Sequence, residues 1–159
     1  MAMKIETLAG DGKAFGSGPD NPHGPHLQFE LDEQGARGFV TFQDKFQGWP
    51  GMVHNGLLVL GLDDAMFFAT VNATDSYSMS VELKLSMEQP VLVNEPLIIK
   101  AWVDKIDERK VYTKGEIRRG QDNSLLARGQ GLYILVKGRE EAKASENLAN
   151  VRLSRTLDS

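Results

Sequence analysis

Two acidic residues in an apolar stretch are the first candidates for chemistry. Asp63 and Asp64 are adjacent in the middle of residues 57–71, which are otherwise almost entirely apolar. Burying a carboxylate costs free energy, so two of them in such a stretch call for a reason. Loss of hydration raises the pKa of a carboxyl group, which suits a general base or a nucleophile. The structural alternative is that each carboxylate reaches solvent or pairs with a lysine.

The residues that open this stretch form a second candidate. His54, Asn55 and Gly56 stand at the expected start of a helix. The first backbone N–H groups of a helix have no acceptor within it, and the helix dipole attracts negative charge to that end. A small residue there lets a ligand approach the backbone closely. This is how an oxyanion site for acyl transfer is built. The alternative is a helix cap with a structural histidine.

The spacing of the two candidates points to an oligomer. Asn55 and Asp63 are eight residues apart in the sequence, which is about 12 Å along an α-helix. A base must act on an atom about 3 Å from the oxyanion donors, which is difficult along a single helix. A symmetric dimer removes the problem by placing Asp63 of one chain opposite Asn55 of the other. If the chain is an enzyme, we expect its site at a dimer interface.

The remaining histidines indicate a surface loop. His23 and His26 lie in a leader rich in proline and glycine. The sequence places no carboxylate or third ligand beside them to complete a metal site. We therefore expect no metal and no cofactor, because a carboxylate and a helix N-terminus suffice for the chemistry considered above.

Composition limits the class of protein. The chain has 159 residues, 41% of them hydrophobic, and a net charge of −4. This suggests one domain that grips neither nucleic acid nor an anionic membrane through bulk charge. The absence of cysteine excludes disulfide frameworks, zinc ribbons and cysteine nucleophiles. Residues 1–18 contain no secretory signal. Together with the absence of cysteine, this is what we expect of a cytoplasmic protein. Residues 57–71 are too short to span a membrane and contain two aspartates.

Hydrophobic patterning predicts one domain with a polar segment on each side. Residues 1–26 are expected to form an irregular leader, residues 27–137 the folded domain, and residues 138–159 a polar tail. Alternation predicts a hairpin over residues 27–42. The stretch from Asn55 to about Val71 is apolar on nearly every face, which is typical of a buried helix.

Four further strands are predicted after the helix. They cover approximately residues 80–87, 97–104, 111–118 and 125–136, and their short connections favour an antiparallel meander. In the first of them, strict alternation places Ser80 on the face of Glu82 and Lys84, opposite Val81 and Leu83. The predicted class is α+β, with a curved antiparallel sheet wrapped around one central buried helix. Such an arrangement resembles the hotdog fold.

Residues 46–66 carry a closer resemblance. The run Phe-Gln-Gly-Trp-Pro-Gly-Met-Val-His-Asn-Gly, followed by Leu-Asp-Asp-Ala-Met, resembles the signature of hotdog-fold acyl-CoA thioesterases of the phenylacetate-pathway type. In that family a His-Gly-Gly opens the central helix and an acid lies nine positions after the histidine. Here those positions are His54 and Asp63. The resemblance extends over residues 19–136, with further matches at residues 21–24, 80–83, 90–97 and 127–131.

The resemblance implies a role for each matching residue. Asp63 would activate water or act as the nucleophile. The N–H of Asn55, together with that of Gly56, would polarise the thioester carbonyl. His54 would orient the substrate or the loop, and Ser80 would hold the attacking water. The chain departs from the family at Asn55, which replaces the first glycine, and this bears on substrate range.

The implied function is hydrolysis of an acyl-CoA thioester to a carboxylic acid and free CoA by a homo-oligomer, either a dimer or a dimer of dimers. Two alternatives remain: a hydratase or dehydratase acting on acyl thioesters, and a non-catalytic acyl-CoA-binding module. Met66, Phe67 and Phe68 are candidates to line an acyl pocket. The candidates by residue type for contact with CoA phosphates are Lys137, Arg139, Arg118 and Arg119.

Overall fold

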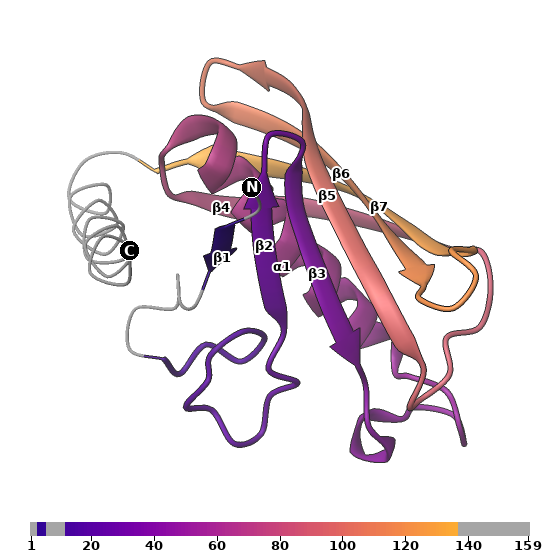
Figure 1. The fold of residues 1–159 in the computed structure, drawn as a ribbon. Helices are drawn as coiled ribbons and strands as arrows, with labels where there is room; N and C mark the ends of the chain where they lie inside the picture. Colours follow the sequence, from indigo (N-terminus) through magenta and orange to yellow (C-terminus); the bar gives the residue numbers. More distant parts are fainter. Residues whose placement is uncertain (1–2, 6–11, 137–159) are drawn as a thin grey trace.

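The computed structural model describes residues 3–5 and 12–136, in which a seven-stranded sheet curls around one long helix (Figure 1). The elements in chain order are β1 (Met3–Ile5), β2 (Gln28–Asp32), β3 (Gly35–Thr41), the short 3-10 helix η1 (Asp44–Phe46), α1 (Asn55–Thr74), β4 (Ser78–Met87), β5 (Pro96–Asp107), β6 (Lys110–Arg119) and β7 (Leu125–Leu135). Every strand pairing is antiparallel. The predicted α+β hotdog architecture is confirmed. The predicted tail, residues 138–159, lies outside the described residues.

The strand order is β1-β2-β3-β5-β6-β7-β4. The predicted hairpin is present as β2 and β3, whereas β1 is a short strand within the leader that was expected to be irregular. The predicted meander is wrong for β4, which pairs with β7 instead of its sequence neighbour β5. Alternation along a strand specifies its faces but does not identify its neighbours.

The segment between β4 and β5, residues 88–95, explains this departure. It leaves the β7 side, where Glu88 N–H donates to the Leu126 carbonyl, and ends beside β3, where Asn94 N–H donates to the Phe42 carbonyl. Between these points it passes the start of α1, and Val53 N–H donates to the Val91 carbonyl. The chain thereby crosses from one margin of the sheet to its middle and forms a wall beside the first turn of the helix.

Helix α1 supplies much of the core. Its apolar residues face the sheet and the loops around it, and Leu58, Leu62, Ala65 and Met66 are fully buried. Its composition and length also match those of a membrane span, but half of that window is buried within the domain, as in the core helix of a soluble protein. The helix ends at Thr74, and its C-cap, Asp75, adopts the left-handed conformation (φ 57°) and donates its N–H to the Val71 carbonyl.

A β-bulge in β4 changes the predicted faces of that strand. The register pairs Ser80 with Tyr133 but Glu82 with Leu132, which leaves Val81 as the extra residue. Directly opposed residues of antiparallel strands share a face. Ser80 therefore lies on the helix-facing side with Tyr133, and not with Glu82 as strict alternation predicted. A single sequence cannot reveal this bulge, because apolar and polar residues still alternate along the sequence of β4.

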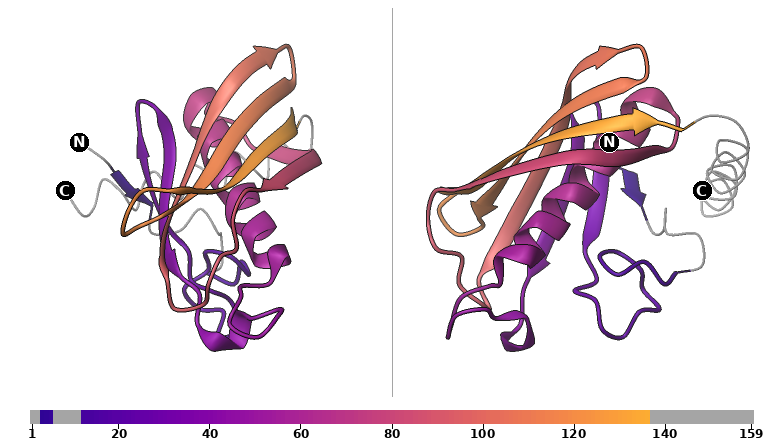
Figure 2. Two further views of the ribbon diagram at one scale, coloured as in Figure 1. Left: turned by 90° about the vertical axis from the view of Figure 1, so that its right-hand side faces the viewer. Right: turned by 180° about the vertical axis from the view of Figure 1, so that it is seen from behind.

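Strand β4 forms the outer margin of the sheet and is largely uncovered (Figure 2). Four of its apolar side chains are well exposed: Met79 (60%), Val81 (59%), Leu83 (38%) and Met87 (40%). An edge strand of this length, with exposed apolar residues and unpaired backbone groups, is a ready site for pairing with another strand.

Candidate active site

Helix α1 begins at Asn55, as predicted, and His54 is its N-cap. The Nδ1 atom of His54 accepts a hydrogen bond from the N–H of Gly56 at 2.9 Å. The cap therefore requires an unprotonated Nδ1. Because this bond occupies the N–H of Gly56, the expectation that Gly56 donates to a substrate does not hold in this conformation. Within the part of the chain that the structure describes, the N–H of Asn55 has no hydrogen-bond acceptor.

The loop before the helix holds His54 in place. His54 N–H donates to the Phe46 carbonyl at 2.9 Å, and Gly48 N–H donates to the Met52 carbonyl at 2.9 Å. Gly48 lies so close to His54 that a Cβ there would be 3.2 Å from its Cα. Gly51 turns the loop with φ +77°, a conformation that side chains rarely adopt. The N-terminus of the helix is therefore exposed, and hydrogen bonds and close contacts of the preceding loop hold it in place.

Asn55 lines two hollows at this end of α1. One, with a volume of about 320 Å³, is mostly apolar and lies between the first turn of α1, the end of β4 and the crossing segment; its lining includes Leu58, Met87, Pro90 and Val91. The other, of about 560 Å³, lies against the preceding loop and is lined by Trp49 and His54 among others. Both hollows share Met52, Val53 and Asn55. A ligand in either hollow would therefore be close to the unpaired N–H of Asn55.

Asp63 lies two turns further along α1 and faces β7. The hydroxyl of Tyr133 donates to Asp63 Oδ1 at 2.6 Å and lies 3.0 Å from the Asp63 carbonyl oxygen. Ser80 of β4 is the cross-strand partner of Tyr133 of β7. Asp63 of α1, Tyr133 and Ser80 therefore lie near the β4 edge of the sheet. Tyr133 was not among the predicted site residues, because it is 70 residues from Asp63 and no local spacing connects them.

Asp64 has different surroundings. Burial, together with the charge of Asp63, raises the pKa of Asp64 from 3.8 to about 7. Its carboxylate lies against Gly16 of the leader, where there is no room for a Cβ. The desolvation expected for a catalytic carboxylate is thus found at Asp64, which the leader covers. Asp63, the position that matches the family, contacts Tyr133 of β7, the strand that pairs with the exposed strand β4.

The other candidate residues are engaged elsewhere or lie outside the described residues. His26 Nε2 contacts the Asn21 carbonyl oxygen, and no group of three metal-ligating side chains occurs among residues 3–5 and 12–136. Arg118 pairs with Glu116, and Arg119 pairs with Glu95. Lys137 and Arg139 are not described.

Of the aromatic acyl-pocket candidates, Phe67 packs against Phe68 and Tyr77 in the manner of a core residue. Met66 and Phe68 belong to the buried core itself. None of the three lines the hollows beside Asn55.

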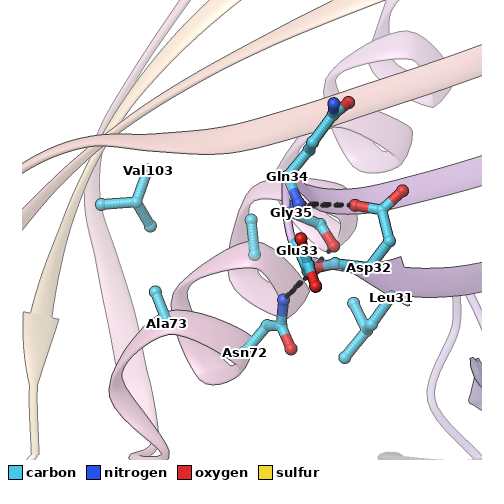
Figure 3. A pocket seen from close by; sticks show the side chains of 9 residues that line it. Leu31, Asp32, Glu33, Gln34, Gly35, Asn72, Ala73 and Val103 are labelled. Atoms are coloured by element: carbon cyan, nitrogen blue, oxygen red, sulfur yellow. Dashed lines mark hydrogen bonds between the residues drawn. The ribbon is translucent and has the colours of Figure 1, made fainter. Parts of the chain in front are cut away.

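A larger hollow, of about 1060 Å³, lies at the opposite end of α1 (Figure 3). Asp32 and Glu33 from the β2–β3 turn line it, and Asn72 of α1 donates to the Asp32 carbonyl at 2.8 Å. Two carboxylates and the C-terminal end of a helix dipole repel anions. This hollow is therefore unsuited to the phosphates of CoA, and we place the candidate active site at the helix N-terminus and Asp63.

Comparison with known proteins gives a consistent result. No protein-family model matches the chain. It is 27% identical over 88 residues to the acyl-coenzyme A thioesterase THEM4 of Bos taurus, a match that covers 55% of this chain and 35% of the relative. The chain thus spans little more than a third of the length of the curated relatives it matches.

Solved structures match over more of the chain. The thioesterase superfamily protein RHA08564 is 27% identical, with a TM-score of 0.70 over 84% of this chain and 68% of that one. The Escherichia coli PaaI protein from the phenylacetic acid degradation operon shares the fold at 18% identity, with a TM-score of 0.66 over 72% of this chain and 82% of that one. Taken with the central helix and the order of the strands, these similarities show that the chain has the hotdog fold and is similar to proteins of the thioesterase superfamily.

Proposed function

We propose that the protein hydrolyses acyl-CoA thioesters to a carboxylic acid and free CoA. The observation that carries the proposal is the unpaired N–H of Asn55 at an exposed helix N-terminus, combined with a carboxylate, Asp63, turned towards the open margin of the sheet. The name of its curated relative, an acyl-coenzyme A thioesterase, supports the substrate class.

The chemistry follows from these two groups. The thioester carbonyl oxygen accepts a hydrogen bond from Asn55 N–H, which stabilises the negative charge that develops there. Asp63 takes a proton from water, the hydroxide adds to the carbonyl carbon, and the carbon–sulfur bond breaks. The departing thiolate then recovers the proton from Asp63. Attack by Asp63 itself would give an anhydride that water cleaves. The Ser80 hydroxyl, on the same face as Tyr133, would hold the water.

The two groups are too far apart on one helix, and a dimer through β4 would bring them together. Ser80 and Asp63 lie towards the beginning of β4, whereas Met87, at its end, lines the same hollow as Asn55. Two-fold antiparallel pairing of β4 with its copy places the beginning of one strand against the end of the other. Asp63 of one chain would then approach the helix N-terminus of its partner. The exposed apolar residues of β4 support this arrangement.

The test is release of CoA, followed with a thiol reagent, from a panel of short, long and aryl acyl-CoAs. The chain contains no cysteine, so the protein adds no thiol background. Asp63→Asn should reduce turnover by about a hundredfold or more, the usual contribution of a general base. The matched control is Asp64→Asn, which removes the neighbouring carboxylate and should retain most of the activity.

Three results would contradict the proposal. Equal turnover by Asp63→Asn and the wild type would exclude Asp63 as base or nucleophile. Loss of the enoyl absorbance of crotonyl-CoA without thiol release would favour a hydratase. Tight CoA binding without turnover of any substrate would favour a binding module.

A further inference from the structure

The buried hydroxyl of Tyr133 makes polar contacts with one residue, Asp63. The residue is only 1% exposed, and its hydroxyl lies 2.6 Å from Asp63 Oδ1. A second acceptor, the Asp63 carbonyl oxygen, is 3.0 Å away. A hydroxyl has one proton, and the shorter contact to a carboxylate is the stronger of the two. Both acceptors belong to Asp63, so the hydroxyl is directed at this one residue of α1.

The ring of Tyr133 has little freedom to move. A Cβ at Gly131, two residues earlier on β7, would be 2.7 Å from Tyr133 Cε2, and the same position is enclosed by Thr113 Oγ1 and Met66 Sδ. Thr113 Oγ1 donates to the Gly131 carbonyl at 3.1 Å, and β6 and β4 pair with β7 on its two sides. The hydroxyl is therefore presented from a rigid strand.

Tyr133 can donate a proton in a hydrogen bond but cannot serve as a base. Burial, and then the charge of Asp63, raises the pKa of the Tyr133 hydroxyl far above its ordinary value of 10.0. The hydroxyl is therefore protonated at neutral pH. The second oxygen of the Asp63 carboxylate, Oδ2, accepts no hydrogen bond from the described side chains.

We propose that Tyr133 is a positioning residue, whose hydroxyl binds Oδ1 of Asp63 and thereby presents Oδ2 to the water or the thioester. This inference rests on the proposed function, since it assigns a role within the same site. A carboxylate turns about its side-chain bonds unless one oxygen is held. Holding Oδ1 from a rigid strand limits that rotation and keeps the reacting oxygen in one place.

The test compares Tyr133→Phe with Tyr112→Phe, a matched loss of a tyrosine hydroxyl on the neighbouring strand β6. Circular dichroism and melting temperature establish that each variant folds. Because the hydroxyl holds the reacting carboxylate in one orientation, we expect kcat of Tyr133→Phe to fall about ten- to hundredfold, with KM changed less than about twofold. Tyr112→Phe should leave both constants near those of the wild type.

A purely structural role for Tyr133 would not shift the pH profile. Removing a donor from a carboxylate disfavours its ionised form, so the acidic limb of kcat should move to higher pH in Tyr133→Phe and stay in place in Tyr112→Phe. In an Asp63→Asn background, Tyr133→Phe should have no further effect on kcat. An unchanged kcat and acidic limb in a folded Tyr133→Phe would overturn the inference.

Two further measurements keep this test separate from that of the proposed function. If the wild type releases no CoA, the proposed function fails, and a ¹³C NMR titration of the Asp63 carboxyl carbon still tests the contact: its midpoint should rise in Tyr133→Phe.

If Tyr133→Phe does not fold, 3-fluorotyrosine is incorporated into a Tyr77→Phe, Tyr112→Phe chain. The more acidic phenol is a stronger donor and should move the midpoint to lower pH. An unmoved midpoint in either experiment would overturn the inference.

Discussion

The unusual carboxyl of Asp64 leads to a quantitative prediction about stability. Loss of hydration, and then the charge of Asp63, raise the pKa of Asp64 in the folded protein from its ordinary value of 3.8 to about 7. Between these two pH values the folded chain keeps a proton that the unfolded chain has released. The free energy of unfolding therefore decreases as pH rises from about 4 to about 7, since the folded state binds more protons over this range.

The size of the effect follows from the shift. A difference of about three pKa units, at about 1.4 kcal/mol per unit, corresponds to about 4 kcal/mol as an upper figure. This contribution of Asp64 is fully present below pH 4, declines through the interval and is lost above about pH 7. It is a large part of the roughly 5–15 kcal/mol that stabilises an ordinary domain.

The perturbation is Asp64→Asn, which preserves the shape of the side chain and removes its titration. Urea unfolding at several pH values between 4 and 8, at a fixed protein concentration, gives the free energy of unfolding of the variant and the wild type. The variant should lose less stability over this range, by up to about 4 kcal/mol. Asp104→Asn, at an exposed carboxylate of β5, controls for the loss of one negative charge. Parallel pH dependences for Asp64→Asn and the wild type would refute the argument.

Three further predictions concern the proposed site. Val81→Lys places a charge on the exposed edge strand β4. The variant should be a monomer by size-exclusion chromatography with light scattering and should not release CoA, and an active monomer would contradict the proposed dimer. His54→Ala should lower the free energy of unfolding by about 1 kcal/mol, whereas His54→Asn, which retains a cap acceptor, should lower it less; equal values would exclude a capping role. Asn55→Gly should change the relative rates for different acyl-CoAs, and identical turnover throughout the panel would show that Asn55 does not shape specificity.

Local patterns predicted the elements that depend on local chemistry. The start of α1 at Asn55 follows from the residues around His54, and the inward face of β6 follows from alternation through Val111, Thr113, Gly115 and Ile117. The central helix was recognisable because it is apolar on nearly every side. These features depend on side-chain type and on the periods of helix and strand, which a sequence displays directly.

Other features depend on contacts between distant segments. The position of β4 beside β7, the bulge at Val81 and the contact of the Asp64 carboxylate with Gly16 arise when separate parts of the chain pack together. None of them alters the period of hydrophobicity within its own segment, so the sequence did not reveal them.

The sequence by itself thus determined the α+β class, the apolar helix that begins at Asn55 and the carboxylate nine positions after His54, because each is a pattern within a short stretch of chain. Only the tertiary structure decided which of the two aspartates is covered by the leader and which is held by Tyr133. The physical reason is that hydration and hydrogen bonding of a side chain depend on its neighbours in space, and for Asp63 the decisive neighbour lies 70 residues away.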